Sequence, residues 1–198
     1  MVWLNKDVIF QTMNHSFLEK KQPPGNTLQL ELLFDRKKIK QRLAVQAEAL
    51  EMLYGKEEIT IVMIMKGAFF LVADLMRTLR LPLRVEFLQC SSYGELGMHK
   101  GELQITGLEN LDIKGKHVLL VDDIFDLGGT ISEVFEQMKQ KEPLSLRSLV
   151  LLSKDVPRNT DYRPDFSLFD IEDRFVVGYG LDYKEYYRSL PDIYAINP

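Results

Sequence analysis

Residues 118–130, VLLVDDIFDLGGT, combine side chains and backbone that suit the binding of a charged ligand. The segment holds three carboxylates and two glycines in close succession, which are Asp122, Asp123, Asp126, Gly128 and Gly129. Glycines let a backbone approach a ligand closely, and the unpaired amides at the start of a helix attract phosphate. Carboxylates beside that position would repel a phosphate unless they bind sugar hydroxyls or a hard cation such as Mg²⁺. The segment therefore predicts a site for a ligand that carries a phosphate, a ribose and a metal ion.

The flanking elements are those needed to position this segment. Residues 118–121 are all apolar, which is typical of a buried strand in a parallel sheet, and we expect the strand to end at Asp122 and Asp123. Residues 131–141 place apolar side chains at helical spacing. The order strand, acidic turn and helix puts the turn at the carboxyl end of a strand, where open parallel sheets bind ligands. The alternative is an acidic turn with a glycine cap and no ligand.

This segment resembles the phosphoribosyl-pyrophosphate (PRPP) binding motif of the type I phosphoribosyltransferases. The family pattern is four apolar residues, two acids, two apolar residues, Asp or Ser, Thr, Gly, any residue and Thr. Leu127 replaces the usual Thr, which removes one hydroxyl from the expected phosphate pocket but leaves its backbone amides. The resemblance implies an α/β fold with a central, mainly parallel sheet flanked by helices, a small hood formed by terminal segments, and a mobile flap.

Two further segments resemble active-site loops of the same family. Lys66 and Gly67 follow the apolar run of residues 59–65 and match the first loop, which contacts pyrophosphate and often contains a non-prolyl cis peptide. Residues 91–107 hold four glycines and match the flap, with its Ser-Tyr pair at Ser92 and Tyr93. Without the resemblance, the lysine is equally a solvated charge, and the glycine-rich stretch is an exposed loop or a loose hairpin.

The carboxyl-terminal part resembles the purine-binding hood of hypoxanthine-guanine phosphoribosyltransferases. The pattern there is a Lys after an apolar strand, then FVVGY, then LDY with an Arg six residues past the Asp. The matching residues are Lys154, Phe175, Val176, Asp182 and Arg188. If the resemblance is set aside, core packing explains Phe175 and a surface charge explains Lys154.

The resemblance implies transfer of phosphoribose from PRPP to a ring nitrogen of a 6-oxopurine, with Mg²⁺ as cofactor. Asp122 and Asp123 would hold the ribose hydroxyls and, together with Asp182, the metal ion. The backbone amides of residues 126–130 and the hydroxyl of Thr130 would bind the 5′-phosphate.

Other residues are candidates for binding the leaving pyrophosphate and for accepting the proton of the purine. Pyrophosphate would contact Lys66, Gly67 and Arg188. Asp126 would act as the general base that accepts the purine proton. A solvent-exposed aspartate is a weak base at pH 7, so this role requires burial or a substrate close by.

Recognition of the base would fall to the hood. Phe175 would stack on the purine, and Lys154 would donate a hydrogen bond to the 6-oxo group. The backbone carbonyl of Val176 would accept from the ring N–H beside it, with Asp182 close by. A donor at the 6-position disfavours adenine, whose 6-amino group is also a donor.

The remaining elements follow from apolar periodicity. An amphipathic helix is expected from Asp35, its cap, to Gly55, and a mostly buried helix over residues 68–80 is closed by Pro82. Strands are expected at residues 59–65, 83–89, 146–152 and 175–177, with an edge strand at 193–196. Residues 1–30 give no clear pattern. The chain reads as one domain, 1–198, whose hood comes from the amino-terminal segment and about residues 154–198.

Composition excludes several classes of function. The net charge of −4 gives no basic footprint for nucleic acid, and no apolar run is long enough to span a membrane. Cys90 is the single cysteine, and the three histidines have no metal-ligand spacing. Lys6 and Asp7 interrupt the apolar start, so we expect no signal peptide and a cytoplasmic protein. The expected partners are PRPP and a purine base, and the family implies a homodimer or homotetramer.

Other functions compete with this interpretation. A PRPP-sensing regulator that binds nucleic acid keeps this fold without the chemistry, but Asp126, Asp182 and the lack of a basic patch oppose it. Lys154 and Phe175 oppose a pyrimidine substrate, whereas a xanthine-preferring transferase stays open. A generic nucleotide-binding α/β protein is disfavoured because the chain has neither G-x-G-x-x-G nor a P-loop.

Overall fold

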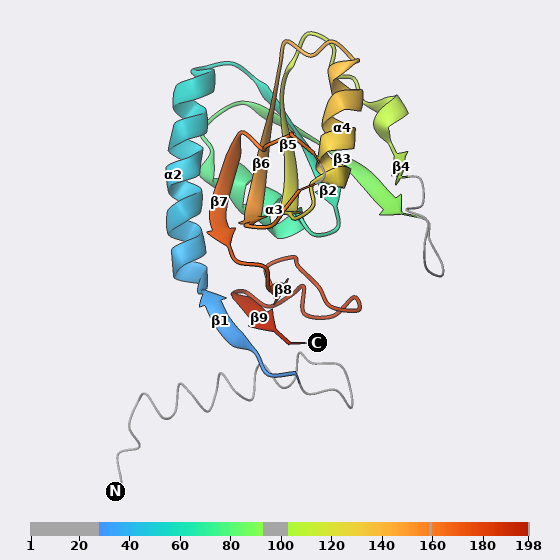
Figure 1. The fold of residues 1–198 in the computed structure, drawn as a ribbon. Helices are drawn as coiled ribbons and strands as arrows, with labels where there is room; N and C mark the ends of the chain where they lie inside the picture. Colours follow the sequence, from blue (N-terminus) through green and yellow to red (C-terminus); the bar gives the residue numbers. More distant parts are fainter. Residues whose placement is uncertain (1–27, 93–102, 159, 198) are drawn as a thin grey trace, which may run out of the picture.

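A six-stranded sheet with the order β4-β3-β2-β5-β6-β7 forms the centre of the fold (Figure 1). The computed structural model describes residues 28–92, 103–158 and 160–197. The strands of this sheet are β2 (Ile59–Met65), β3 (Leu83–Ser92), β4 (Leu103–Thr106), β5 (His117–Phe125), β6 (Ser145–Lys154) and β7 (Phe166–Ile171). All neighbouring strands are parallel except β3 and β4, which are antiparallel. The predicted α/β fold with a mainly parallel central sheet is confirmed.

Helices cover both faces of this sheet. The helices α2 (Arg36–Tyr54) and α3 (Phe69–Thr78) share one apolar core with the sheet, and α4 (Gly129–Lys139) packs in the core on the other face. A short 3₁₀ helix, η1 (Leu108–Asn110), precedes β5. The predicted ends of α2 are confirmed, because the Asp35 carboxylate accepts from the Lys38 amide at 2.7 Å and Gly55 ends the helix with φ of 64°. None of the described helices is both long and apolar enough to cross a membrane.

The apolar run in β5 is explained by burial on both faces. Val118 and Leu120 pack in the core that contains α4, whereas Leu119 and Val121 pack in the core that contains α2 and α3. Alternate side chains of a strand point to opposite faces. In a strand that helices cover on both sides, every side chain is therefore buried, and apolar residues are favoured throughout. This packing fixes the position of the acidic residues at its end.

The chain order places a topological switch point between β2 and β5. The strand after β2 in the sequence, β3, lies on one side of it, and β5 lies on the other. The segments that leave the carboxyl ends of β2 and β5 therefore diverge, which opens a crevice between them. Lys66 and Gly67 follow β2, and the acidic turn with its glycines lies at the end of β5.

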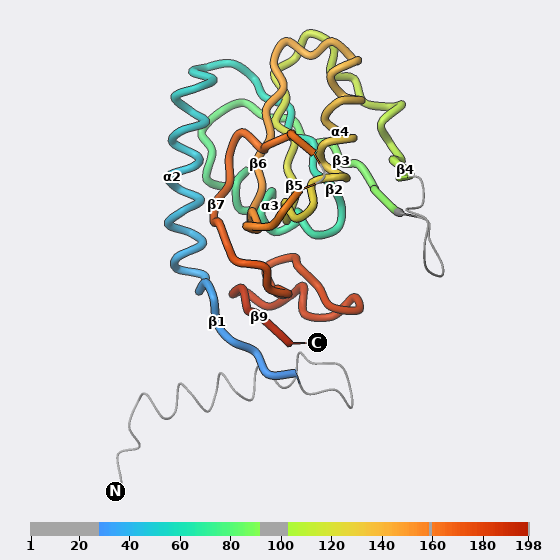
Figure 2. Tube along the Cα trace, in the orientation of Figure 1, coloured from blue at the N-terminus to red at the C-terminus, as the bar shows by residue number. Residues whose placement is uncertain are grey.

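A second, smaller sheet is assembled from distant parts of the sequence. It has the order β1-β9-β8, with β1 (Glu31–Phe34), β8 (Phe175–Val177) and β9 (Ile193–Ile196), and both pairings are antiparallel. Figure 2 shows β1 and β9 side by side, although they lie far apart in the sequence. The prediction of an edge strand at 193–196 is wrong, because β9 is the central strand and all four of its residues are buried.

The sequence prediction also differs from the structure at the end of β5 and in two strands that it missed. The strand β5 does not end at Asp122 but continues to Phe125, because β6 goes on pairing with it after β2 has diverged. The strands β1 and β7 were not predicted; β7 pairs with β6 at the edge of the larger sheet. Of the two structures considered for residues 91–107, β4 supports the hairpin, since it pairs with β3. Ser92 is the last residue of β3, whereas Tyr93 lies outside the described residues.

Candidate active site

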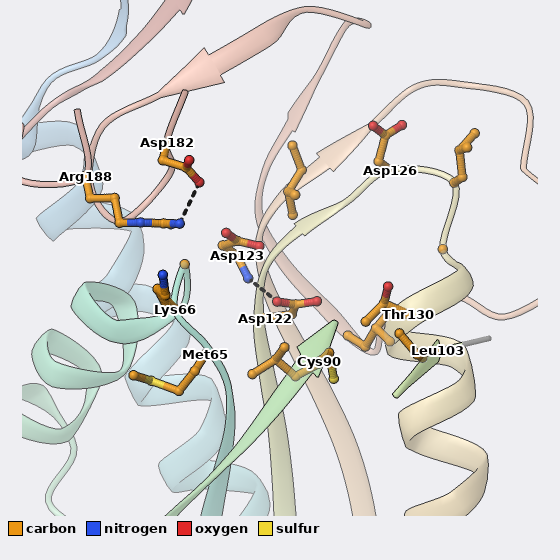
Figure 3. Close-up of a pocket in the computed structure, with 16 residues that line it drawn as sticks. Met65, Lys66, Cys90, Leu103, Asp122, Asp123, Asp126, Thr130, Asp182 and Arg188 are labelled. Carbon is orange, nitrogen blue, oxygen red and sulfur yellow. Dashed lines mark hydrogen bonds and ion pairs between the residues drawn. The ribbon is translucent and has the colours of Figure 1, made fainter. Parts of the chain in front are cut away.

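A cleft of about 450 Å³ lies at the carboxyl ends of β2 and β5 (Figure 3). Its walls come from the β2–α3 connection, the end of β5, the start of α4 and the β8–β9 connection. It brings together most of the predicted PRPP-binding residues, which are Lys66, Gly67, Asp122, Asp123, Asp126, Leu127, Gly128, Thr130, Asp182 and Arg188. Gly129 does not line the cleft and instead begins α4.

Two adjacent carboxylates form the floor of this cleft. The amide of Asp123 donates to Oδ1 of Asp122 at 2.9 Å, which draws the Asp122 carboxylate back toward the backbone. Burial, and then repulsion by the Asp123 carboxylate, raise the pKa of Asp122 well above its usual range. Burial also raises the pKa of Asp123. Groups that stabilise the ionised pair, such as ribose hydroxyls or a cation, would be bound favourably here.

The turn between β5 and α4 has the geometry expected of a phosphate loop. Gly128 has φ of 83°, and a Cβ atom there would lie 2.7 Å from both the Phe125 ring and the Thr160 methyl group. Only glycine fits this position. The helix α4 begins at the next residue, so the amides of its first turn have no partners within the helix and can bind an anion.

Gly67 lines the cleft and packs against Gly180, and neither has room for a side chain. A Cβ atom on Gly67 would lie 1.5 Å from Oδ2 of Asp123, and one on Gly180 would lie 2.0 Å from the Gly67 carbonyl oxygen. The family's non-prolyl cis peptide is found in this loop, between Met65 and Lys66. Gly67 is therefore held between β5 and the β8–β9 connection, and its carbonyl and amide have little freedom to move.

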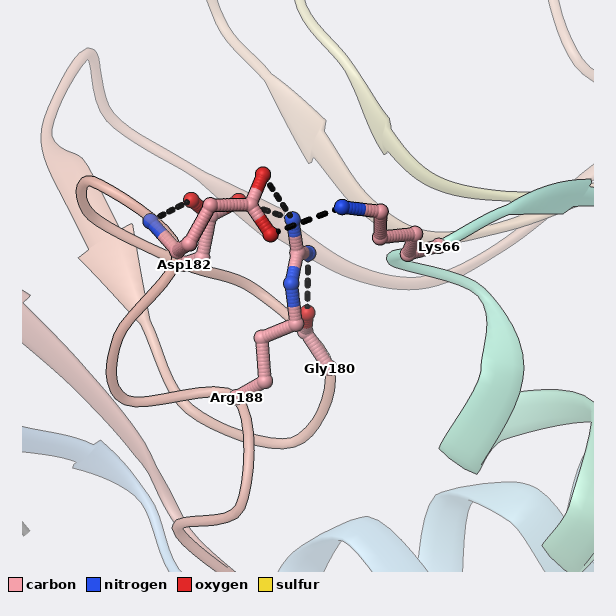
Figure 4. A network of polar contacts seen from close by, with 5 residues as sticks. Lys66, Gly180, Asp182 and Arg188 are labelled. Carbon is pink, nitrogen blue, oxygen red and sulfur yellow. Dashed lines mark hydrogen bonds and ion pairs between the residues drawn. The ribbon is translucent and has the colours of Figure 1, made fainter. Parts of the chain in front are cut away.

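Positive charge is supplied from two sides of the cleft. Figure 4 shows Lys66, which follows β2, pointing toward the segment that carries Asp182 and Arg188. Lys66 Nζ donates to Glu185 at 2.9 Å, and Arg188 Nη2 lies 2.7 Å from Oδ1 of Asp182. Arg188 also donates to the Gly180 carbonyl at 2.8 Å, so its guanidinium is held on two sides. The two cations that the sequence assigns to pyrophosphate are thus oriented into the same cleft.

A second cleft of about 190 Å³ adjoins the first, and Asp123, Asp126 and Asp182 line both. It contains all four predicted purine-binding residues, Lys154, Phe175, Val176 and Asp182, together with Ile124 and Leu181. Phe175 is 43 % exposed as a residue, which is unusual for an aromatic residue in a strand and leaves its ring free to stack. The ring is also fixed by an edge contact with Tyr183, at 5.5 Å between centroids.

Lys154 lines the second cleft and contacts Asp126, which lines both clefts. Its ammonium group donates to Oδ2 of Asp126 and to Oδ1 of Asp173, both at 3.1 Å. Burial alone would lower the pKa of Lys154, but these two hydrogen bonds outweigh it and raise the pKa above its ordinary value. The lysine is therefore a charged donor directed at the second cleft, and not a surface charge.

Several residues of the site could not be found in the sequence. Cys90 lines the first cleft, where burial raises the pKa of its thiol to about 11, and Leu181 lines the second. Asp173 and Glu185 hold the cations of the site, yet Asp173 stands in an acid-rich stretch and Glu185 in a stretch of tyrosines and mixed charges, and both look like ordinary surface. Their roles depend on which cation the fold places opposite them.

The fit of Mg²⁺ can be judged from the chemistry of the donors. Among the residues that the structure describes, no group of three or more His, Cys, Asp and Glu side chains is arranged to hold a metal ion. The available donors are carboxylate oxygens, and Asp182 is already paired with Arg188. Mg²⁺ commonly binds through one or two carboxylates and completes its shell with water and substrate phosphates. The residues therefore fit a magnesium ion that binds together with a phosphorylated substrate.

Comparisons with known proteins agree with this geometry. The family model of the phosphoribosyl transferase domain matches residues 30–184. The chain is 42 % identical over 168 residues to a hypoxanthine-guanine phosphoribosyltransferase of Aquifex aeolicus. The aligned region covers 84 % of this chain and 94 % of the relative.

Solved structures give the same result. A hypoxanthine-guanine phosphoribosyltransferase from Bacillus anthracis superposes with a TM-score of 0.80 at 30 % identity, over 86 % of this chain and all of the other. A hypoxanthine phosphoribosyltransferase from Trypanosoma cruzi, in complex with the product IMP, superposes with a TM-score of 0.77 at 31 % identity, over 89 % and 98 % of the two chains. The resemblance noted in the sequence is confirmed, and the chain belongs to the phosphoribosyltransferase family, among its hypoxanthine-guanine phosphoribosyltransferases.

Proposed function

We propose that this chain transfers the 5-phosphoribosyl group of PRPP to a 6-oxopurine, hypoxanthine or guanine, giving IMP or GMP and pyrophosphate, as in purine salvage. One observation carries the proposal. A cleft lined by carboxylates, a phosphate loop and two cations adjoins a smaller cleft with an exposed aromatic ring and a buried lysine, and Asp126 lines both. A sugar phosphate and a flat base would meet at this residue.

The reaction forms a bond between the anomeric carbon of the ribose and a purine nitrogen and breaks the bond from that carbon to pyrophosphate. The carbon passes through a state with oxocarbenium character, so positioning and electrostatics provide most of the catalysis. Asp126 would accept the proton that leaves the purine nitrogen. Its side chain is 44 % exposed, so the bound substrates must supply the burial that a carboxylate base needs.

The remaining residues would hold the ends of PRPP. Asp122 and Asp123 would bind the ribose hydroxyls, and the first turn of α4 with the Thr130 hydroxyl would bind the 5′-phosphate. Lys66 and Arg188 would neutralise the leaving pyrophosphate. Oxygen atoms of Asp122, Asp123 and Asp182 would hold Mg²⁺, which supplies further charge neutralisation when bound.

Base selectivity would come from Lys154. Replacing Lys154 with glutamine is expected to raise the KM for hypoxanthine by about 10- to 100-fold, because a charged hydrogen bond to the 6-oxo group is lost. The KM for PRPP should change much less. Steady-state kinetics with each substrate varied in turn checks this, and Lys139→Gln in the last turn of α4 is the control. A KM for hypoxanthine equal to that of the unaltered protein would remove Lys154 from base recognition.

The departure from the family motif gives a second prediction. Replacing Leu127 with threonine should lower the KM for PRPP about five-fold, because it returns one hydroxyl that can donate to the 5′-phosphate. The side chain is 49 % exposed, so the substitution disturbs no core packing. Titration of ribose 5-phosphate into both proteins measures the effect without turnover. Weaker binding by the variant would show that the phosphate does not approach this position.

The proposed function is tested by measuring pyrophosphate release with PRPP, Mg²⁺ and each of hypoxanthine, guanine, xanthine and adenine. Turnover with hypoxanthine or guanine, dependent on Mg²⁺ and absent with adenine, is the expected result. Turnover with xanthine alone would retain the mechanism and change the specificity. Binding of PRPP without turnover of any base would favour the non-catalytic regulator.

The proposed activity also implies a domain organisation, a location and an oligomeric state. The chain would act as one domain, 1–198, with the small sheet as a hood over the base and residues 91–107, including Ser92 and Tyr93, as a flap that keeps water from the reacting carbon. We expect a homodimer or homotetramer in the cytoplasm that binds no nucleic acid and no membrane. Light scattering after gel filtration gives the number of subunits.

A further inference from the structure

The connection between β8 and β9 contains a tight turn whose sequence is unusual for its conformation. The backbones of Tyr183 and Tyr186 exchange two hydrogen bonds, of 3.2 and 3.0 Å, around Lys184 and Glu185. These two central residues have φ of 53° and 67°. Positive φ at both positions defines a two-residue hairpin turn that strongly favours Asn-Gly. A lysine and a glutamate adopt it only at a cost in backbone strain, which often marks side chains with a function.

The turn places the Glu185 carboxylate between the two cations of the first cleft. Its Oε2 accepts from Lys66 Nζ at 2.9 Å, and its Oε1 lies 3.5 Å from Arg188 Nη2 (Figure 4). The backbone amide of Glu185 donates to Oδ2 of Asp182 at 2.8 Å, and this hydrogen bond holds the turn next to Asp182. The hydrogen bond from Lys66, with the nearby charge of Arg188, lowers the pKa of Glu185, so the carboxylate is ionised at neutral pH.

We propose that Glu185 is a positioning residue for pyrophosphate, whose carboxylate bridges Lys66 and Arg188 in the ligand-free protein and gives way to the pyrophosphate group of PRPP. The inference rests on the proposed function, in which these two cations neutralise the leaving group. In the ligand-free protein, the Glu185 carboxylate keeps the two positive charges of Lys66 and Arg188 directed toward the same place in the cleft. When pyrophosphate is bound, the displaced carboxylate repels it. The charge of Glu185 therefore lowers the affinity for pyrophosphate and favours its release.

The test is the affinity of the full chain for inorganic pyrophosphate in the presence of Mg²⁺, measured by calorimetry. Glu185→Gln keeps the shape of the side chain and removes its charge, and it should bind pyrophosphate about five-fold more tightly. Glu185→Asn removes the same charge and tolerates positive φ better, so it should show the same gain. The matched control is Glu58→Gln, which loses an exposed ion pair with Arg84 at the opposite end of β2. It changes the net charge equally and should leave the affinity unchanged.

Two further measurements separate a local charge effect from a structural one. In a Lys66→Met background the gain from Glu185→Gln should shrink, because the cation for which the carboxylate competes is gone. In steady-state assays Glu185→Gln should lower the KM for PRPP while the KM for the purine stays the same. A merely structural role would move both constants in the same direction.

Unchanged or weaker pyrophosphate binding by the Glu185 variants, or an equal gain in Glu58→Gln, would overturn this proposal. A constant effect of Glu185→Gln in the Lys66→Met background would overturn it as well. Absence of turnover with every purine counts only against the proposed function, since the pyrophosphate titration requires no turnover.

Discussion

Replacing Asp126 with asparagine should lower kcat by about two to four orders of magnitude, the usual contribution of a general base. Asparagine has the same shape and can still accept a hydrogen bond from Lys154, but it cannot take up the purine proton. PRPP binding should survive, because the phosphate, ribose and pyrophosphate contacts assigned above use other side chains, and the substitution keeps the backbone amide of residue 126. Rapid-quench measurement of a single turnover, with PRPP affinity determined separately, distinguishes the two effects.

A matched control for Asp126 is available in the same cluster. Asp173 also binds Lys154 at 3.1 Å, but its side chain is 70 % exposed and it does not line either cleft. Asp173→Asn removes the same charge from Lys154 and should change kcat only a few-fold. If the two variants lose the same turnover, Asp126 acts through Lys154 and not as a base. Loss of PRPP binding by Asp126→Asn, with turnover of bound substrate intact, would also refute the assignment.

Replacing Gly67 with alanine should raise the KM for PRPP by about 100-fold, the cost of misplacing a binding group by about 1 Å. The added methyl group would lie 1.5 Å from the Asp123 carboxylate, so either this carboxylate or the Lys66–Gly67 loop must move. The loop cannot move away from Asp123, because Gly180 packs against the Gly67 carbonyl on the other side of the loop. Either movement separates a ribose-binding group from a pyrophosphate-binding group. Steady-state kinetics and PRPP titration measure the loss.

A remote glycine provides the comparison for Gly67. Gly115 has φ of 66°, and, its chain neighbours aside, none of the described residues has an atom within 4 Å of its missing Cβ; it lies just before β5, at the end away from the cleft. Gly115→Ala should lower the melting temperature through backbone strain and leave the KM for PRPP unchanged. Gly67→Ala should instead raise the KM for PRPP, whatever its effect on the melting temperature. If both variants lose stability and neither loses PRPP affinity, close packing at Gly67 has no part in substrate binding.

The sequence was sufficient for the site wherever chemistry and local structure come from the same few residues. Residues 118–130 carry their own strand, acids and glycines, so their pattern predicted the strand, the turn and the start of the helix that form this wall of the cleft. The length of β5 was not predictable in this way, because its last residues remain in the sheet only through pairing with β6. Similarly, the four apolar residues of β9 did not reveal that both of its edges are paired.

The acidic partners of the cations in the site were the other feature that the sequence did not predict. Lys66, Lys154 and Arg188 were predicted from motifs that surround them. Asp173 and Glu185 have no motif of their own, and they lie 19 and 119 residues from the lysines that they bind. Contacts at such separations depend on the folded topology, and a charged residue looks the same whether it faces water or a cation.

The small sheet has a consequence for synthesis of the chain on the ribosome. Among the strands that the structure describes, both β1 and β8 pair only with β9, so neither forms a ladder until residues 193–196 have left the exit tunnel, whereas every strand of the larger sheet has emerged earlier. Domains generally begin to fold from the amino-terminal side while translation continues. A nascent chain could therefore form the larger sheet, with the acidic turn of β5 and the start of α4, before the small sheet and the β8–β9 connection, which adds Asp182 and Arg188 to the first cleft, are in place. Premature termination just before β9 would leave it in that condition permanently.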